Sequence, residues 1–474
     1  MQTTSLSTRQ PEQAGSDSAS SRSPLPAALA LAATSLGLGV VQLDITIVNT
    51  ALSSISTSLG GSVAELQWVV TAYTIAFAAF ILTAGALGDR VGAKRIFIGG
   101  FVIFTLASLA CALAPSAMFL IVARSVQGLA AAILVPNSLT LLNHAYTDPK
   151  ARGRAVGFWA AGASVALTAG PLVGGALIAL IALVGWRAIF LVNLPIGAAG
   201  LWLAWRYAEE TPRLAQREID LPGQIAAITA LGGLAGALIE GGVLGWSHPL
   251  VITGFAGAAV IGLLFVWREA RALQPMLPLS LFRHRMFALT ALVGLLFNIA
   301  FYGLIFVLSL YFQNVNGWSP FATGLAFVPM MAMVLPANLI AASISERLGA
   351  PQAIALACMI TAAGCVALLP MTSGTSYWAI GAQLIILGGG LGLLVPALTS
   401  TLLGSVEKSR SGIAAGVLNA TRQTGSVLGV ALFGSLVGGN NTFMAGAHAS
   451  LVISAAVLLA GAVAILQGRA KEGR

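Results

Sequence analysis

The chain has 474 residues, of which 57% are apolar and only 8% are charged. A soluble globular domain has about a quarter of its residues charged, so this composition excludes one and indicates a membrane protein. The formal net charge of +9 would suit a nucleic-acid-binding protein, but the basic residues are spread over short loops, and we therefore expect no nucleic-acid partner.

Residues 1–24 are rich in Ser, Gln, Thr and Pro, which predicts a disordered cytoplasmic tail. The apolar run that follows Arg22 superficially resembles a signal peptide. It is too long for one, contains Asp44 and precedes thirteen more apolar runs, so we expect that it is not cleaved.

Fourteen apolar runs follow the tail. A membrane-spanning helix needs about 20 mostly apolar residues, because the hydrocarbon core of a bilayer is roughly 30 Å thick. The predicted spans are 26–50, 66–87, 95–114, 118–142, 155–182, 187–206, 221–240, 249–267, 287–312, 322–345, 352–371, 377–403, 411–438 and 447–467. The predicted fold class is therefore an all-α polytopic membrane protein with 14 transmembrane helices.

The basic residues alternate between the gaps. All of the 24 Lys and Arg residues except Arg124, Arg187 and Arg422 lie in the tails or in the gaps that follow even-numbered spans. Cytoplasmic loops of membrane proteins are enriched in Lys and Arg. The pattern predicts a multi-pass protein of the cell (inner or plasma) membrane with both termini in the cytoplasm.

The chain also repeats itself weakly. Three short segments recur in the same order at nearly the same offset: 88–93 with 345–350, 128–136 with 388–396, and 152–157 with 410–416. The repeat unit then holds six spans, and the two spans between the units have no counterpart. Two six-helix halves with a substrate site between them are a transporter architecture.

The predicted domains follow from this repeat. They are a cytoplasmic tail at 1–24, an N-terminal six-helix half at 25–207, two extra helices at 208–270, a cytoplasmic linker at 271–286, a C-terminal six-helix half at 287–467 and a tail at 468–474.

Asp44 is the clear exception among the acidic residues, because it lies in the middle of the first span. A charge at the bilayer centre costs about 2.5–3.5 kcal/mol on insertion scales, so such a residue faces a cavity or a partner. A carboxyl group in these surroundings can load a proton on one side and release it on the other. A structural ion pair or a polar helix contact is the alternative interpretation. Glu240, near the end of its span, suits a membrane interface better.

Two cations lie within spans. Arg124 is the expected fixed charge beside Asp44 or an anionic group, with helix–helix contact as the alternative. Arg422 belongs to a mid-span polar patch. The side chains that we expect to line a central cavity are Gln42, Thr46, Asn49, Trp68, Tyr73, Phe77, Trp159, Phe297, Phe301, Tyr302, Asn419 and Arg422. Ordinary packing is the alternative for most of them.

Two glycine-containing segments suggest moving parts. The loop at 85–95 is short and charged, and we predict a cytoplasmic latch formed by Gly85, Asp89, Arg90, Gly92 and Lys94. In this prediction Asp89 caps the helix that follows or bridges to a basic neighbour.

The fifth span contains Gly170, Pro171, Gly174 and Gly175. This sequence can bend the helix or seal the pathway, with general packing of small residues as the alternative.

These motifs resemble the major facilitator superfamily, in its fourteen-span drug:proton antiporter branch, and are similar to the methylenomycin-resistance type of antibiotic exporter over residues 30–467. The matching residues are Leu43, Asp44, Thr46, Val48, Asn49, Ala51 and Leu52 in the first span; Gly85, Leu87, Asp89, Arg90, Gly92 and Lys94 in the loop; Arg124, Gln127 and Gly128 in the fourth span; and Gly170, Pro171, Gly174 and Gly175 in the fifth. Ser53, Ala93 and Ala166 depart from the family pattern. The resemblance implies proton coupling through Asp44 and Arg124.

The expected function is proton-driven export of small amphipathic or lipophilic compounds, antibiotics among them, by alternating access. An uptake symporter of a small organic solute and a non-transporting membrane sensor are the alternatives. An intramembrane enzyme is disfavoured because the sequence has no HExxH, GxSxG or P-loop motif. We expect no cofactor and no metal, since Cys111, Cys358 and Cys365 show no paired spacing. The expected partners are substrate, protons and the lipid bilayer, and we expect a monomer.

Overall fold

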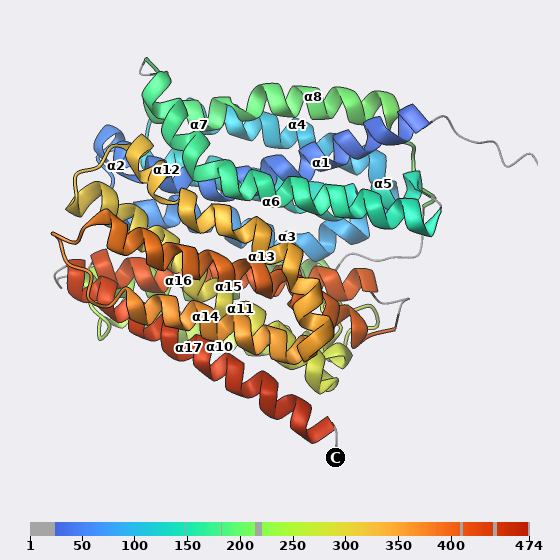
Figure 1. The fold of residues 1–474 in the computed structure, drawn as a ribbon. Helices are drawn as coiled ribbons and strands as arrows, with labels where there is room; N and C mark the ends of the chain where they lie inside the picture. The colour runs from blue at the N-terminus through green and yellow to red at the C-terminus, as the bar shows by residue number, and fades with distance from the viewer. Residues whose placement is uncertain are drawn as a thin grey trace, which may run out of the picture.

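The computed structural model describes residues 24–146, 148–181, 183–213, 220–407, 411–438 and 443–472. Within these ranges the regular structure is entirely helical (Figure 1). The elements are α1 (Pro24–Ile47), η1 (Val48–Ala51), α2 (Leu52–Leu59), α3 (Val63–Val91), α4 (Ala93–Ala112), α5 (Ala117–Ala145), α6 (Pro149–Leu180), η2 (Gly185–Arg187), α7 (Ala188–Leu191), α8 (Asn193–Tyr207), α9 (Leu221–Leu244), α10 (Pro249–Glu269), η3 (Leu279–Arg283), α11 (Arg285–Leu310), η4 (Tyr311–Val315), α12 (Pro320–Ala326), α13 (Val328–Leu348), α14 (Ala350–Ala367), α15 (Tyr377–Gly404), α16 (Ser411–Gly438) and α17 (Phe443–Glu472).

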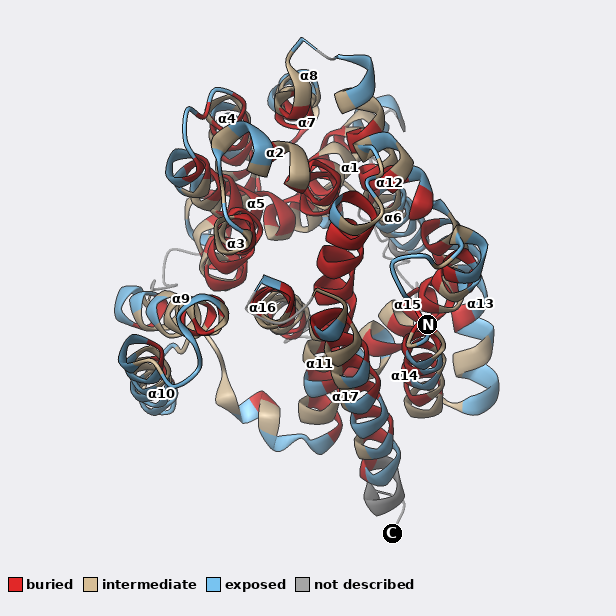
Figure 2. Ribbon diagram, turned by 90° about the vertical axis from the view of Figure 1, so that its left-hand side faces the viewer, coloured by how far each residue is buried: buried red, intermediate tan, exposed pale blue. Residues whose placement is uncertain are grey.

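Thirteen helical segments among the described residues are long and apolar enough to cross a membrane, and they correspond to every predicted span except 411–438. The helix over that segment, α16, is 28 residues long, but a run of polar residues that includes Thr421, Arg422 and Gln423 interrupts its apolar stretch. α16 lies between α3 and α11 in the interior of the bundle (Figure 2). Neighbouring helices therefore pack on both sides of this polar segment.

Local chemistry sets the helix ends. Side chains of Ser62, Ser116, Asp148 and Asp220 accept hydrogen bonds from the first free N–H groups of α3, α5, α6 and α9. Ser62 and Glu65 form a complete capping box. The helix of the first span runs past the predicted end at residue 50, through the 3₁₀ turn η1 and into α2. It stops at Gly60, whose φ of 67° lies in the left-handed region.

Other spans are interrupted where the sequence predicts one helix. The predicted span 187–206 consists of η2, α7 and α8, and the predicted span 322–345 divides into α12 and α13 at Phe327. Val328 and Pro329 follow this break, and a proline has no backbone N–H to donate to a carbonyl of the preceding turn.

The sequence repeat recurs in the geometry. Gly92 and Gly349 occupy matching positions, with φ of 113° and 93°, and each donates its N–H to the carbonyl four residues earlier at 2.9 Å. Gly128 packs against the backbone carbonyl of Tyr73, and its counterpart Gly388 packs against that of Met330. Both glycines leave no room for a Cβ atom. The two halves of the chain therefore use the same close helix crossings.

The helices form two packed groups with α9 and α10 beside them. α1 and α3–α8 pack on one another, as do α11–α17, and α9 contacts α3 and α16 (Figures 1 and 2). We call the end of the bundle that holds the start of α1, Gly92, Gly349 and the linker 270–284 the terminal end. The opposite end, with the connections 60–62, 113–116, 245–248 and 316–319, is the distal end. The predicted domain boundaries stay predictions.

Candidate functional site

Asp44 lies fully buried in α1, where its carboxylate forms an ion pair with Nη1 of Arg124 from α5. Both side chains are shielded from solvent, with 0% and 1% of their surface exposed. A buried ion pair is stable only when further hydrogen bonds satisfy the remaining polar atoms, because both charges have left water. The surroundings of the pair therefore decide what it can do.

Neutral donors complete the site. Nε2 of Gln127 donates to Oδ1 of Asp44 at 2.9 Å, and Nδ2 of Asn193 donates to the same oxygen at 3.0 Å. Both amides also donate to Oγ of Ser108, at 2.8 and 3.3 Å. Nη1 of Arg124 donates to Oε1 of Gln127 at 2.8 Å. α1, α5 and α8 thus meet at one carboxylate, and every hydrogen bond to this carboxylate comes from a donor group. Ser108 of α4 holds the two amides from behind.

The guanidinium of Arg124 is held in place on several sides. Its Nε donates to the carbonyl of Val69 at 3.2 Å. Its central carbon lies 4.2 Å from the ring centre of Tyr73 and 5.8 Å from that of Phe190. Aromatic faces attract cations, and the attraction grows when water is excluded. Arg124 is consequently held in place by contacts that do not involve Asp44. The carboxylate is then the member of the pair whose charge can change without displacing the other.

The other polar residues predicted in α1 lie between helices. Thr46 donates to the carbonyl of Leu167 in α6 at 2.9 Å. Asn49 donates to carbonyls of its own helix and accepts a hydrogen bond from Gln313 at 3.4 Å through its backbone carbonyl. Gln42 is half-buried. The predicted stripe therefore faces α6 and the second group of helices.

The predicted aromatic residues divide between two places. Tyr73 and Phe77 contact each other edge to face, with ring centres 6.2 Å apart. In α11, Phe301 stacks on Phe297 at 6.1 Å and meets Tyr302 edge to face at 5.3 Å. All of these side chains are buried. Both groups of helices therefore contribute buried rings to the interior.

Two predicted tryptophans lie elsewhere. Trp68 faces α9, where its ring lies 3.3 Å from the position a Cβ atom would take on Gly236. Trp159 donates to Oγ of Ser138 at 3.2 Å, between α6 and α5. In α16, Asn419 and Arg422 are half-buried, and Nε of Arg422 is buried without a hydrogen-bond partner among the described residues.

The glycines of α6 allow it to touch both groups of helices. Gly170 packs on Thr46, and Gly174 packs on Thr50 and Ile47 of the first span. Gly175 faces the other group, where an added Cβ atom would lie 2.5 Å from the carbonyl oxygen of Pro320. α6 continues through Pro171 without a break. This segment therefore forms the contact between the groups at the distal end.

The segment 85–95, predicted as a latch loop, is helical except at Gly92, because α3 continues to Val91 and α4 begins at Ala93. It is organised by a residue that the sequence analysis missed. Oε1 of Glu210 accepts hydrogen bonds from the backbone N–H of Lys94 at 3.0 Å and of Thr211 at 3.1 Å. Its Oε2 lies 3.6 Å from Nε of Arg95. Oγ1 of Thr211 accepts from the N–H of Ala93 at 3.0 Å. Glu210 and Thr211 thus cap α4, the role the sequence suggested for Asp89.

Asp89 and Arg90 lie in the last turn of α3. A Cβ atom added to Gly85 would lie 3.6 Å from Cβ of Pro136 in α5. Gly92 allows Glu210 to approach closely, since an added Cβ atom would lie 2.6 Å from the carboxyl carbon of Glu210. Of the predicted latch residues, Gly92 and Lys94 therefore belong to the cap of α4, whereas Gly85 packs on α5.

Replacing Glu210 with Ala is expected to slow transport severalfold and to do so more than Lys94→Ala does. Lys94 contributes a backbone N–H, which the Lys94→Ala variant keeps. The carboxylate of Glu210 makes the contacts with Lys94, Arg95 and Thr211, and Glu210→Ala loses all three. Helix capping by a carboxylate is worth about 1 kcal/mol. Initial rates of transport in vesicles measure the effect. A larger loss for Lys94→Ala would contradict this assignment.

Comparison with known families decides the classification. A model of the Major Facilitator Superfamily matches residues 34–430. The chain belongs to the Major Facilitator Superfamily. Its antiparallel helices, its repeated glycine crossings and its two packed groups are thus features of a member of that superfamily.

Named relatives within the superfamily are resistance proteins. The chain is 37% identical over 444 residues to the methylenomycin A resistance protein of Streptomyces coelicolor, covering 94% of this chain and 93% of that protein. It is 37% identical to the methylenomycin A resistance protein of Bacillus subtilis, over 90% and 91% of the two chains. It is 38% identical to the multidrug resistance protein Stp of Mycobacterium tuberculosis, over 86% and 75%.

Solved structures of superfamily members show the same fold. A bacterial homolog of the human lysosomal transporter Spinster, in an inward-facing and unoccupied conformation, matches with a TM-score of 0.65 and 16% identity, covering 94% of this chain and 99% of that one. The human organic anion transporter MFSD10 matches with a TM-score of 0.63 and 16% identity, covering 93% and 99%.

Three residues of the Asp44 site escaped the site prediction. Gln127 belongs to the matching residues of the fourth span, yet nothing in the sequence assigns it to the carboxylate, and Ser108 has no sequence signal at all. An amide in an apolar helix is the signal that could have found Asn193, because such a group needs partners inside the bundle.

Proposed function

We propose that this superfamily member is a proton-coupled exporter, a drug:H⁺ antiporter, of small amphipathic or lipophilic compounds, antibiotics among them. The names of its relatives support export of drugs. The alternation of Lys and Arg supports a cell-membrane location with both termini in the cytoplasm. The terminal end of the bundle is then cytoplasmic.

The buried carboxylate of Asp44 is the observation that carries this proposal. Its ion pair with Arg124 and its two amide donors suit the ionised form. A proton that binds Asp44 removes the charge attraction to Arg124, while Tyr73, Val69 and Gln127 continue to hold the guanidinium. Proton binding therefore loosens α1 from α5 without displacing Arg124.

Contacts between α1 and α6 connect this loosening to the second group of helices. Two residues after Asp44, Thr46 packs on Gly170 of α6, and about one turn farther along α6, on the side that faces the second group, Gly175 touches Pro320. Movement of α1 therefore acts on the contact between the two groups at the distal end.

Alternating access then requires that contact to break and re-form. At the distal end, Oγ of Ser53 donates to Oδ1 of Asn314 at 2.6 Å. Nε2 of Gln67 donates to the carbonyls of Val430 and Ala431, at 3.1 and 2.7 Å. Release of substrate on this side needs these contacts to open, whereas they close the path while substrate enters from the terminal end.

The interior suits amphipathic compounds. The rings of Phe297, Phe301 and Tyr302 offer apolar surface. Nε of Arg422, which has no hydrogen-bond partner in the part of the chain that the structure describes, offers one polar contact. We propose that the pump needs no cofactor and works as a monomer within the bilayer, with protons and substrate as its partners. One proton entering down a 100 mV potential supplies about 2.3 kcal/mol, which sustains a roughly 50-fold gradient of a neutral compound.

A drug-susceptibility panel tests this function. Expression of the protein in a pump-deficient host should raise the inhibitory concentration of at least one antibiotic severalfold, and an uncoupler should abolish the corresponding efflux of a fluorescent compound. Inverted membrane vesicles distinguish the direction, because an exporter accumulates the compound in them. A panel without any shift, or efflux that survives the uncoupler, would refute the proposal.

A further inference from the structure

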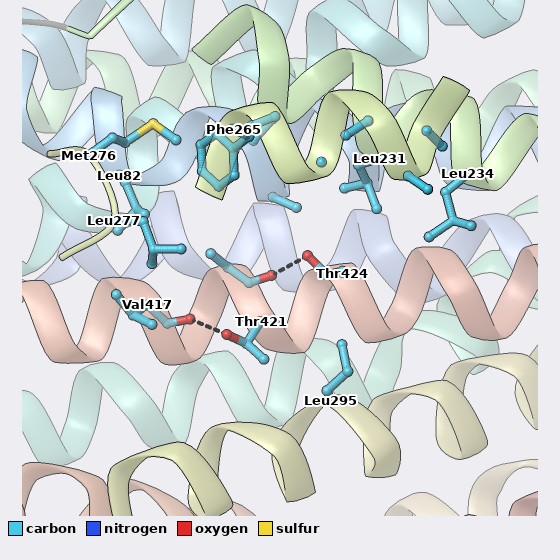
Figure 3. A pocket seen from close by; sticks show the side chains of 18 of the residues that line it. Leu82, Leu231, Leu234, Phe265, Met276, Leu277, Leu295, Val417, Thr421 and Thr424 are labelled. Carbon is cyan, nitrogen blue, oxygen red and sulfur yellow. Dashed lines mark hydrogen bonds between the residues drawn. The ribbon is translucent and has the colours of Figure 1, made fainter. Parts of the chain in front are cut away.

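A cavity of about 680 Å³ lies outside the Asp44 site, between the two extra helices and the main bundle. Its walls come from α3, α9, α10, α11 and α16, and the linker before η3 closes it at the terminal end through Met276 and Leu277 (Figure 3). This volume falls within the range of small-molecule pockets. Nothing in the proposed transport cycle uses this space.

The walls of the cavity are almost entirely apolar. Thr421 and Thr424 are exceptions, but each hydroxyl donates to a carbonyl of its own helix, Val417 at 2.8 Å and Ala420 at 2.9 Å (Figure 3). Sδ of Met276 accepts a hydrogen bond from Thr83 at 3.3 Å. The two hydroxyls can still accept a hydrogen bond, but a cavity of this size offers water few other polar partners among the described residues, and each water needs two to four. A hydrocarbon chain is the occupant that fits this chemistry.

The depth of the cavity matches one leaflet of a bilayer. On α10 its lining runs from Phe255 to Phe265, which at 1.5 Å per residue is about 15 Å. The hydrocarbon core of a bilayer is roughly 30 Å thick, so the cavity spans about half of it. Because one end reaches the linker 270–284, this half belongs to the leaflet at the terminal end.

A basic side chain stands on the linker that closes the cavity. Arg271 is exposed there, whereas Arg283, farther along the linker, lines a separate pocket with Pro351 and Thr401. Arg271 lies over the ring of Trp267, 4.4 Å from its centre, an arrangement typical of a membrane interface. Arg268 is engaged with Asp220 at 2.6 Å. Exposed arginines at this level attract the phosphate of anionic lipids.

The packing explains why the space exists. The principal neighbour of α10 is α9, and Figure 2 shows both helices at the side of the bundle, separated from α11 by the course of the linker. Because a void forfeits the dispersion contacts of its walls, an empty cavity here would leave the extra helices weakly held. A bound chain would supply contacts that neighbouring helices do not.

We propose that this cavity binds one acyl chain of an anionic phospholipid from the leaflet at the terminal end, with its head group at Arg271. The lipid joins the two extra helices to α16, a helix of the second group. This assigns the extra helices a lipid-binding role that is independent of the proton site.

Photo-crosslinking in vesicles tests the proposal on the full chain. The probes are phosphatidylglycerol and phosphatidylcholine, each with a diazirine on one acyl chain. We expect crosslinks on Leu231, Phe265 and Leu277, with the anionic probe giving several times the yield of the zwitterionic one. Crosslinks spread evenly over lipid-facing residues, or equal yields of the two probes, would overturn the proposal.

Matched variants separate the cavity from the general lipid surface. Ala230→Trp and Gly262→Phe fill the cavity from α9 and α10 and should each reduce the crosslinking at least fivefold, whereas Ala256→Trp, on the exposed face of α10, should leave it unchanged. Should one filling variant fail to fold in a thermal-unfolding assay, the other decides. Unchanged crosslinking in a folded filling variant would contradict the site.

Two further arms identify the ligand. Arg271→Gln should remove the preference for the anionic probe while crosslinking from the chain persists, whereas Arg283→Gln, in a separate pocket, should leave the preference unchanged. Addition of an exported compound should leave the yield unchanged. Displacement of the probe by that compound would overturn the lipid assignment and make the cavity a drug site, whatever the outcome for the proton site.

Discussion

Replacing Asp44 with Asn is expected to abolish uphill export while the protein still inserts into the membrane. Asparagine keeps the shape of the side chain but cannot ionise, so proton binding no longer changes the attraction to Arg124. The compound would then equilibrate instead of accumulating, and the gradient would fall from the roughly 50-fold that one proton sustains at 100 mV to none.

Inverted vesicles with an imposed pH gradient and membrane potential measure this effect. Exchange of labelled for unlabelled compound at equal concentrations should continue in Asp44→Asn, because exchange needs no net proton movement. Asp148→Asn is the matched control: Asp148 caps α6 at the surface, and asparagine caps helices equally well. An Asp44→Asn variant that still concentrates the compound would refute the role of the carboxylate.

The unpaired arginine is a complication that a second variant resolves. Removing one partner of a buried ion pair typically destabilises a protein by about 3–5 kcal/mol, because the remaining charge is left without compensation. The double variant Asp44→Asn with Arg124→Gln removes both charges. It should recover the lost stability without recovering uphill export, which separates folding from coupling.

The sequence was informative wherever a residue conflicts with its apolar surroundings. Spans could be predicted because each is long and apolar, and Asp44 and Arg124 stood out because charges are costly at the centre of a bilayer. The sequence also suggested Arg124 as a charge beside Asp44 or an anionic group, and the structure decides between these, because the two side chains form an ion pair although they lie 80 residues apart. Trp68 shows the limit: a helix that is apolar all round gives no periodic signal for which face points inward.

Contacts made by loop residues were harder to predict. Glu210 caps α4 from a gap 116 residues away, and no pattern near Lys94 indicates this partner. The division of the predicted span 322–345 at Phe327 was missed because length and hydropathy carry no information on local breaks. The cavity beside α10 is likewise a product of how the helices pack, and composition alone does not predict it.

Replacing Gly175 with Leu is expected to reduce transport by about one to two orders of magnitude. An added Cβ atom would lie 2.5 Å from the carbonyl oxygen of Pro320 and 2.8 Å from the Cα of Phe321, and these backbone atoms cannot give way as a flexible side chain would. Overpacking costs about 1–3 kcal/mol, which corresponds to a roughly 5- to 150-fold shift in an equilibrium. Because the contact joins the two groups of helices, the cost falls on the state that is closed at the distal end.

A shift of this kind predicts a specific change in accessibility. A cysteine at Ser53, which bonds Asn314 across the same contact, should react faster with a water-soluble thiol reagent when Gly175→Leu is present. The native cysteines Cys111, Cys358 and Cys365 are buried and should contribute little background.

Two comparisons give the test its specificity. Gly324→Leu should act like Gly175→Leu, because Gly324 packs on the carbonyl of Pro171 from the opposite group. Gly157→Leu, on the same helix as Gly175 but with nothing within 4 Å of its Cβ position, should leave both transport and labelling unchanged. If the two substitutions at the contact lowered transport without opening Ser53 to the reagent, the glycines would serve folding of each group and not closure between them.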